Sequence, residues 1–274
     1  MSSHAKAAGA VLSLGILAAC GGGGGGGSAQ IAPPNSFTLG TAGKVTESRA
    51  DISRSSDGRI VLNMTEGDMA GMTVLCEDQT MGRCQVVGGP AGTSAEGTLL
   101  QRMAGSYAFV GNFAVLQLVN GTLVSNNQLA HGALPETASI TPTLPAGQAS
   151  YTGAFEAGFG LASGESGLMS GNAQLIANFN TGQLSGAFSG ATESGTGINA
   201  SFNNITISAT NGEFTSNDDT LILFQGAEAG GDIHGAFYGP NADEAAGIFN
   251  FGNAAGGMSG VFLTCHGNTA TCLE

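Results

Sequence analysis

The chain contains 274 residues and carries a formal net charge of −13 at pH 7. All seven Lys and Arg residues occur at or before Arg102, whereas the 172 residues that follow carry twelve Asp and Glu. Proteins bind polyanions by neutralising them with Lys and Arg, which argues against nucleic acid, heparin-like chains and anionic lipid head groups as partners of this half. A basic partner, a neutral glycan or an apolar ligand stays open, and the negative charge also favours a soluble monomer.

The chain begins with an apolar segment that ends in Leu17-Ala18-Ala19-Cys20 and is followed by seven glycines. The segment is too short to cross a bilayer, which takes about 20 apolar residues, and no later segment of that length is continuously apolar. Small residues before a cysteine resemble the lipobox of bacterial lipoprotein precursors. The resemblance implies a signal peptide at residues 1–19 and a Cys20 that carries fatty acyl chains such as palmitate. These chains would anchor the protein in the outer membrane, at the cell surface. The alternative is an ordinary secretory signal.

Residues 20–36 are expected to form a flexible tether with a reach of roughly 20 Å, because polyglycine has no side chains to pack. The polar residues 28–57 are typical of a linker and entry segment. Apolar or alternating runs predict strands at 59–64, 72–76, 83–87 and 107–119, whereas residues 97–104 fit a helical turn or a strand. Three prolines between 131 and 147 mark a boundary. We therefore expect a small β-rich region at 37–147 and a second domain at 148–274.

Four cysteines remain after Cys20, namely Cys76, Cys84, Cys265 and Cys272. Of the three pairings that four cysteines allow, the local one joins Cys76 to Cys84 and Cys265 to Cys272. It closes two short loops and suits an oxidising envelope. A four-thiolate zinc site is the alternative, but its usual C-x₂₋₄-C spacing is absent. The spacing favours two disulfides and no metal.

From Gln148 onward apolar and polar residues alternate, which places each apolar set on one face of a strand. Gly-x-Phe recurs five times, and a glycine beside a phenylalanine lets a ring lie over bare backbone while the sheet coils. We predict an all-β fold with an eight-stranded antiparallel soluble β-barrel, and an antiparallel sandwich is the alternative. Short strands with a polar face argue against an outer-membrane pore. Nine segments are candidates for its eight or nine strands: 149–157, 171–179, 183–189, 200–209, 212–216, 219–225, 231–238, 246–252 and 257–264.

The stretch from residue 235 to 249 resembles the G-x-FYGP-x-A-x-E-x-GG-x-F block of the transferrin-binding protein B family. The resemblance implies a strand, a turn that begins at the proline and a return strand, so the motif residues are expected to be structural. It also implies a lipid-anchored barrel, here preceded by a smaller handle-like sheet, but no ligand-binding residue can be carried over. One departure is Ala246, where the family has glycine. The matching residues are Gly235, Phe237, Tyr238, Gly239, Pro240, Ala242, Glu244, Gly247 and Phe249.

No enzyme chemistry is predicted, because the chain has neither a G-x-S-x-G elbow nor a phosphate loop with its lysine. His131, His234 and His266 are the histidines after the leader. We expect His234 and His266 to be exposed, and either is a candidate axial ligand for haem; no resident cofactor is predicted. The leading hypothesis is a surface lipoprotein that captures an extracellular ligand, an iron-carrier protein or haem, for uptake. The alternative is a structural or adhesive surface protein without a transport role.

Overall fold

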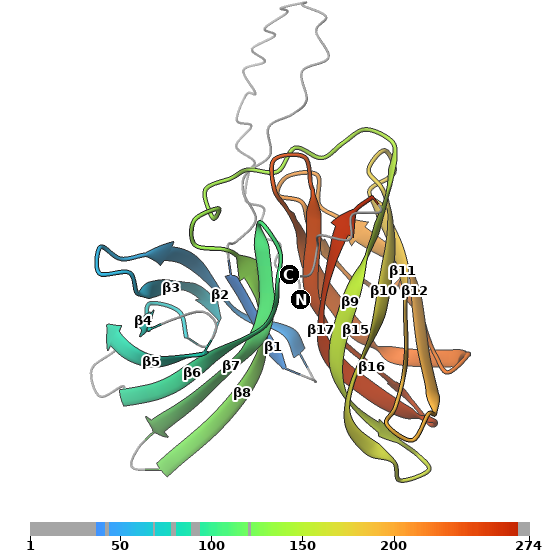
Figure 1. Ribbon diagram of the computed structural model, residues 1–274, viewed down its shortest axis with the longest axis horizontal. Helices are drawn as coiled ribbons and strands as arrows, with labels where there is room; N and C mark the ends of the chain where they lie inside the picture. The colour runs from blue at the N-terminus through green and yellow to red at the C-terminus, as the bar shows by residue number, and fades with distance from the viewer. Residues whose placement is uncertain are drawn as a thin grey trace, which may run out of the picture.

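The computed structural model of the chain describes residues 37–41, 44–67, 69–77, 81–88, 94–119 and 122–267. Within these ranges the chain is all-β and contains no helix. The predicted signal peptide, Cys20 and the tether lie outside the described residues, as does Cys272. No helix in the described part is long and apolar enough to span a membrane. Figure 1 shows two strand-built bodies side by side.

The first body is a closed antiparallel barrel in which each strand pairs with the next and β8 pairs back with β1. The prediction that this region is β-rich is confirmed. The region forms a closed barrel, whereas a smaller handle-like sheet was expected. The segment at 97–104 is a strand. The strands of the first barrel are β1 (Phe37–Thr41), β2 (Lys44–Arg54), β3 (Ile60–Gly67), β4 (Thr73–Cys76), β5 (Met81–Gly88), β6 (Ser94–Ala104), β7 (Ala108–Val119) and β8 (Thr122–Ala133).

The interpretation of residues 28–57 as a linker is wrong for the part that forms β1 and β2. Polar residues dominate β2, but Ala50 and Ile52 alternate with them and are buried in the core of the first barrel. Two inward apolar residues in a strand of eleven are a weak periodic signal. The pairing of β1 with β8 joins segments about 90 residues apart, which no local pattern can show.

The second body contains all nine predicted segments. They form one sheet that closes through pairing of β11 with β12, so the sandwich alternative is wrong. The strands are β9 (Gln148–Leu161), β10 (Ser166–Asn178), β11 (Gln183–Ala191), β12 (Gly197–Ile207), β13 (Glu213–Thr215), β14 (Leu221–Phe224), β15 (Ala227–Tyr238), β16 (Glu244–Asn253) and β17 (Gly256–His266).

Strands β13 and β14 share one position in this barrel. Both pair with β12 on one side and with β15 on the other, and the short segment 216–220 separates them. The nine strands therefore occupy eight positions around the ring. This arrangement resolves the choice between eight and nine strands in favour of an eight-position barrel with one interrupted strand.

Phenylalanine rings fill the second barrel. The five phenylalanines of the Gly-x-Phe pattern are all buried, at most 1% exposed. Rings from neighbouring strands cover the motif glycines: a Cβ built on Gly247 would lie 2.6 Å from the ring of its cross-strand partner Phe262. A Cβ on Gly235 would lie 2.4 Å from the ring of Phe214. The predicted role of these glycines is confirmed, and the covering ring comes from the adjacent strand.

Cys76 and Cys84 face each other across the β4–β5 hairpin and form a disulfide, as predicted. Cys265 is also disulfide-bonded, but its predicted partner Cys272 is outside the described residues, so that pairing stays a prediction. Replacing Cys76 and Cys84 by serine is expected to lower the free energy of unfolding by about 2.5 kcal/mol, the chain-entropy value for so short a loop. Urea unfolding of the double variant, compared with the oxidised wild type, measures this loss. A change below about 0.5 kcal/mol would contradict a structural role.

Candidate functional site: the interface and groove between the barrels

The two barrels contact each other through β2, β6, β7 and β8 on one side and β15, β16 and β17 on the other. On these last three strands the alternation ends, because both faces of the wall are buried: phenylalanines fill the barrel, and aliphatic residues face the first barrel. Runs such as residues 245–249 therefore read as continuously apolar. The shared apolar cluster contains Ala108, Val110, Ala133, Ala236, Tyr238, Ala246, Ile248, Val261 and Leu263.

Glu244, at the start of β16, holds the turn between β6 and β7 of the first barrel. Its carboxylate accepts hydrogen bonds from the backbone N–H groups of Ser106 at 2.6 Å, Tyr107 at 3.1 Å and Ala108 at 2.9 Å. Gly105 leaves room for it, because a Cβ there would lie 2.5 Å from a carboxylate oxygen. Burial raises the pKa of Glu244, and the three N–H donors oppose that shift. Glu244 is therefore a contact between the barrels.

The other motif residues shape the turn and the wall around Glu244. Gly239 and Ala242 have positive φ values of 84° and 55°, and the carbonyl of Ala242 accepts a hydrogen bond from the Tyr151 hydroxyl at 2.9 Å. The carbonyl of Pro240 accepts one from Thr143 N–H in the connection between the barrels. Phe237 and Phe249 are core residues. These placements fit the expected structural roles, but the sequence had offered no sign that Glu244 reaches the other barrel.

Two histidines and a tyrosine form a buried hydrogen-bonded chain across the interface. Nδ1 of His131 on β8 lies 2.8 Å from the Tyr238 hydroxyl on β15, and Nε2 of His131 lies 3.0 Å from Nδ1 of His234. His131 is 1% and His234 2% exposed. The expectation that His234 is exposed is therefore wrong, because the outer face of β15 packs against β8. His266 is exposed, as expected.

Arg49 on β2 lies beside this chain and pairs with Glu213 on β13, with an N–O distance of 3.0 Å. A second carboxylate, Glu66 on β3, lies 3.6 Å from Arg49 Nε. The Glu213 side chain is only 10% exposed, so this ion pair is a largely buried contact between the two barrels. The interface thus joins an apolar cluster to three separate polar contacts, each of which needs both barrels.

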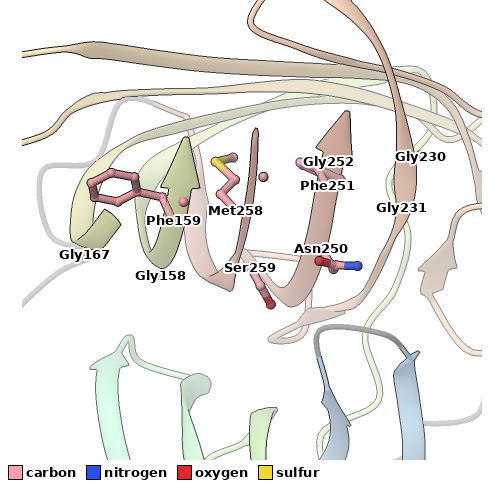
Figure 2. A pocket seen from close by; sticks show the side chains of 12 residues that line it. Gly158, Phe159, Gly167, Gly230, Gly231, Asn250, Phe251, Gly252, Met258 and Ser259 are labelled. Atoms are coloured by element: carbon pink, nitrogen blue, oxygen red, sulfur yellow. The ribbon is translucent and has the colours of Figure 1, made fainter. Parts of the chain in front are cut away.

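Beside the interface, three hollows share residues and form one groove. The middle hollow, of about 180 Å³, is lined by residues of both barrels, with Arg102 and Asn127 on one wall and Glu156 and Ser259 on the other. Gly158 and Ser259 also line the largest hollow, of about 600 Å³. Figure 2 shows this largest hollow along β9, β16 and β17, with strands of the first barrel opposite it. Glu156 also lines the third hollow, of about 370 Å³.

The groove carries charged groups that are free to meet a ligand. Arg102 Nε donates a hydrogen bond to Asn112, but Arg102 takes part in none of the ion pairs among the described residues. Glu156, Glu193 and Leu168, which is 73% exposed, line the same hollow. An apolar side chain and two carboxylates in one hollow suit a lysine or arginine, whose aliphatic stem can cover the leucine while its charge meets an acid group.

The described residues thus form two closed antiparallel barrels, which are joined by buried polar contacts and have a groove beside their interface. Residues 135–265 match the family described as the C-lobe and N-lobe β-barrels of Tf-binding protein B. The second barrel and the connection before it are therefore similar to the β-barrels of transferrin-binding protein B. Among curated proteins no relative matches this chain.

Solved structures of similar proteins include a transferrin-binding protein B variant from Actinobacillus pleuropneumoniae H49. It is 13% identical over 85% of this chain and 100% of that one, with a TM-score of 0.40. The N-lobe of lactoferrin-binding protein B from Moraxella bovis is 12% identical over 85% and 99%, with a TM-score of 0.40. The isotype 1 transferrin-binding protein B from serogroup B Neisseria meningitidis is 14% identical over 85% of this chain, with a TM-score of 0.43. This chain spans 43% of the meningococcal protein.

Proposed function

We propose that this chain is a non-enzymatic surface lipoprotein, anchored through Cys20, that captures an extracellular iron-carrier protein for uptake. The family match of residues 135–265 is the observation that carries the proposal. The lipobox resemblance supports the anchor. Outer-membrane localisation, cell-surface exposure and a monomeric state belong to the same proposal.

The groove between the barrels is the binding site in this proposal. The middle hollow has walls from both barrels, and the side chains of Glu156 and Glu193 take part in none of the ion pairs among the described residues. No Lys or Arg follows Arg102 in the chain, so a partner that docks on the second barrel gains by presenting a basic segment. The lumen of the second barrel is filled with rings, which leaves the exterior for the ligand.

Binding of iron-loaded transferrin and lactoferrin to the full chain, measured by surface plasmon resonance, tests the proposal. The double variant Glu156→Gln/Glu193→Gln is expected to bind the retained carrier about 3- to 10-fold more weakly, because two exposed charge pairs are lost. Raising the salt concentration should weaken the wild type more than the variant. The matched control is Glu228→Gln, an exposed carboxylate on β15 outside the groove. Equal affinity of wild type and double variant would exclude the groove, and binding of neither carrier would exclude an iron-carrier ligand.

Haem is the second ligand in this proposal. His234 is buried and hydrogen-bonded, so His266, which is exposed beside the Tyr151 ring, is the better placed axial ligand. A Soret shift on titration of haem into the chain, lost in His266→Ala, would support it. A structural or adhesive role instead predicts no retained ligand and a phenotype only in attachment or envelope integrity.

A further inference from the structure

The shape of the groove depends on how the two barrels are held together. Arg102 and Asn127 belong to the first barrel, whereas Glu156 and Ser259 belong to the second. A small rotation about the interface changes the distance between these walls. A change that opens or closes the interface therefore also changes the width of the groove.

We propose that His131 and His234 form an acid-sensitive latch, which holds the two barrels together at neutral pH and releases them as the pH falls below about 6. The latch regulates the groove of the proposed function. The opening itself is a property of this chain and needs no ligand.

The hydrogen-bonded side chains of Tyr238, His131 and His234 can hold only a limited number of protons. A single proton lies between Nε2 of His131 and Nδ1 of His234, which are 3.0 Å apart. If both rings become imidazolium ions, both nitrogens carry a proton and the hydrogen bond is replaced by repulsion. Nε2 of His234 is buried and has no hydrogen-bond partner among the described residues, so no acceptor stabilises a positive charge there.

The charged and polar groups that face the two histidines come from both barrels. On the first barrel, Arg49 of β2 adds a positive charge and Thr38 of β1, the cross-strand neighbour of His131, offers only a hydroxyl. On the second barrel, Tyr238 of β15 is hydrogen-bonded to His131, and Glu213 of β13 is paired with Arg49. The remaining carboxylates of the interface are also engaged, Glu66 of β3 with Arg49 and Glu244 of β16 with backbone N–H groups.

These surroundings set the direction of the pH effect. Burial, the neighbouring ring of His234 and Arg49 hold the pKa of His131 well below its usual value. Burial and Arg49 lower the pKa of His234 to about 3. In an open state the solvated rings return to a pKa of about 6.5. The closed state therefore loses stability as the pH falls from about 6.5 toward 3, and each histidine favours opening about tenfold per pH unit in that range.

Protonation of Glu244 affects the stability of the closed state in the opposite direction. The pKa of Glu244 is raised by burial, so the closed state binds that proton more tightly than the open state, and protonation of Glu244 opposes acid opening. The acid response is thus assigned to the histidines.

Hydrogen exchange of the full chain tests the latch, because the N–H groups of Ser106, Tyr107 and Ala108 are bonded to Glu244 across the interface. Between pH 7.5 and 5.0, after correction for intrinsic rates, their protection is expected to fall about 30-fold for each histidine that gains solvent. The backbone amides of β10 that are hydrogen-bonded to the neighbouring strands report on unfolding of the second barrel, and they should stay protected. Replacement by His131→Gln and His234→Asn keeps a hydrogen-bonding amide near each ring position but cannot titrate, so protection of the double variant should not depend on pH.

Three results would overturn the latch. One is protection of these amides in the wild type that stays constant down to pH 4.5. Another is the same pH-dependent loss in the double variant. If the double variant does not fold, NMR titration of the wild-type imidazoles decides: titration of His131 and His234 near pH 6.5 while the three amides stay protected contradicts the latch, and titration coincident with their exposure supports it. No arm uses a ligand, so failure of the iron-carrier assay leaves this result unaffected.

Discussion

Replacing Glu244 by alanine is expected to lower the free energy of unfolding by about 3 kcal/mol, because a buried charge-assisted contact is lost. The carboxylate is 3% exposed and accepts three backbone N–H groups of the other barrel. Alanine leaves these donors with no acceptor in a region from which water is largely excluded. Thermal and urea unfolding measure the loss, and hydrogen exchange at residues 106–108 should increase in the same variant.

Two variants make this prediction specific to the Glu244 contact. Glu244→Gln is expected to lose about half as much, since its carbonyl oxygen still accepts but its amide nitrogen faces a donor. Glu228→Gln removes an exposed carboxylate on the adjacent strand β15 and should change stability by less than about 0.5 kcal/mol. If Glu244→Ala is as stable as Glu228→Gln, the contact between the barrels does not depend on this residue.

Phe188→Ala is expected to lower the free energy of unfolding by about 3–5 kcal/mol, the range for truncating a buried phenylalanine. Phe188 is 1% exposed at the centre of the aromatic core of the second barrel. Its ring centroid lies 4.6 Å from that of Phe249 and 5.3 Å from that of Phe155, and it also contacts Phe202, Phe251 and Phe262. Because rings on several strands surround the site, the wall cannot collapse into the cavity without bending the sheet.

Calorimetry of Phe188→Ala should show a melting temperature roughly 10 °C lower for the transition of the second barrel. Phe188→Leu fills much of the volume and should recover more than half of the loss. Leu168→Ala removes an apolar side chain that is 73% exposed and serves as the surface control, with almost no expected change. A loss below about 1 kcal/mol in Phe188→Ala would mean that the rings do not form the packed core described above.

Local patterns were enough to predict the strands of the second barrel. All nine segments appear, because a half-buried strand places every second residue inward and its turns need residues such as Asn211-Gly212. The Gly-x-Phe repeat also indicated where rings lie over backbone. By contrast, the alternation did not predict β1, β2 and β8, since their buried residues include small and polar ones such as Ala50 and Gln128.

Most contacts of the candidate site could not be predicted from the sequence. Glu244 appeared as part of a turn, although its partners are backbone N–H groups about 138 residues away in the chain. His131 and His234 are 103 residues apart, and neither lies near a metal-ligand partner in the sequence. Backbone donors carry no residue-type signal, and a single histidine among apolar residues does not reveal which wall will cover it.

The all-β class, the second barrel's strands, its aromatic interior and the Cys76–Cys84 pairing follow from the order of residues alone, since alternation, turn residues and short loops act over neighbouring positions. Closure of the first region into its own barrel and burial of β15–β17 on both faces became visible in the folded structure. Folding also brought Glu244, the two histidines and the groove walls together. These features depend on pairing and packing between distant segments, where the free energy is gained only after the chain has brought both surfaces into contact.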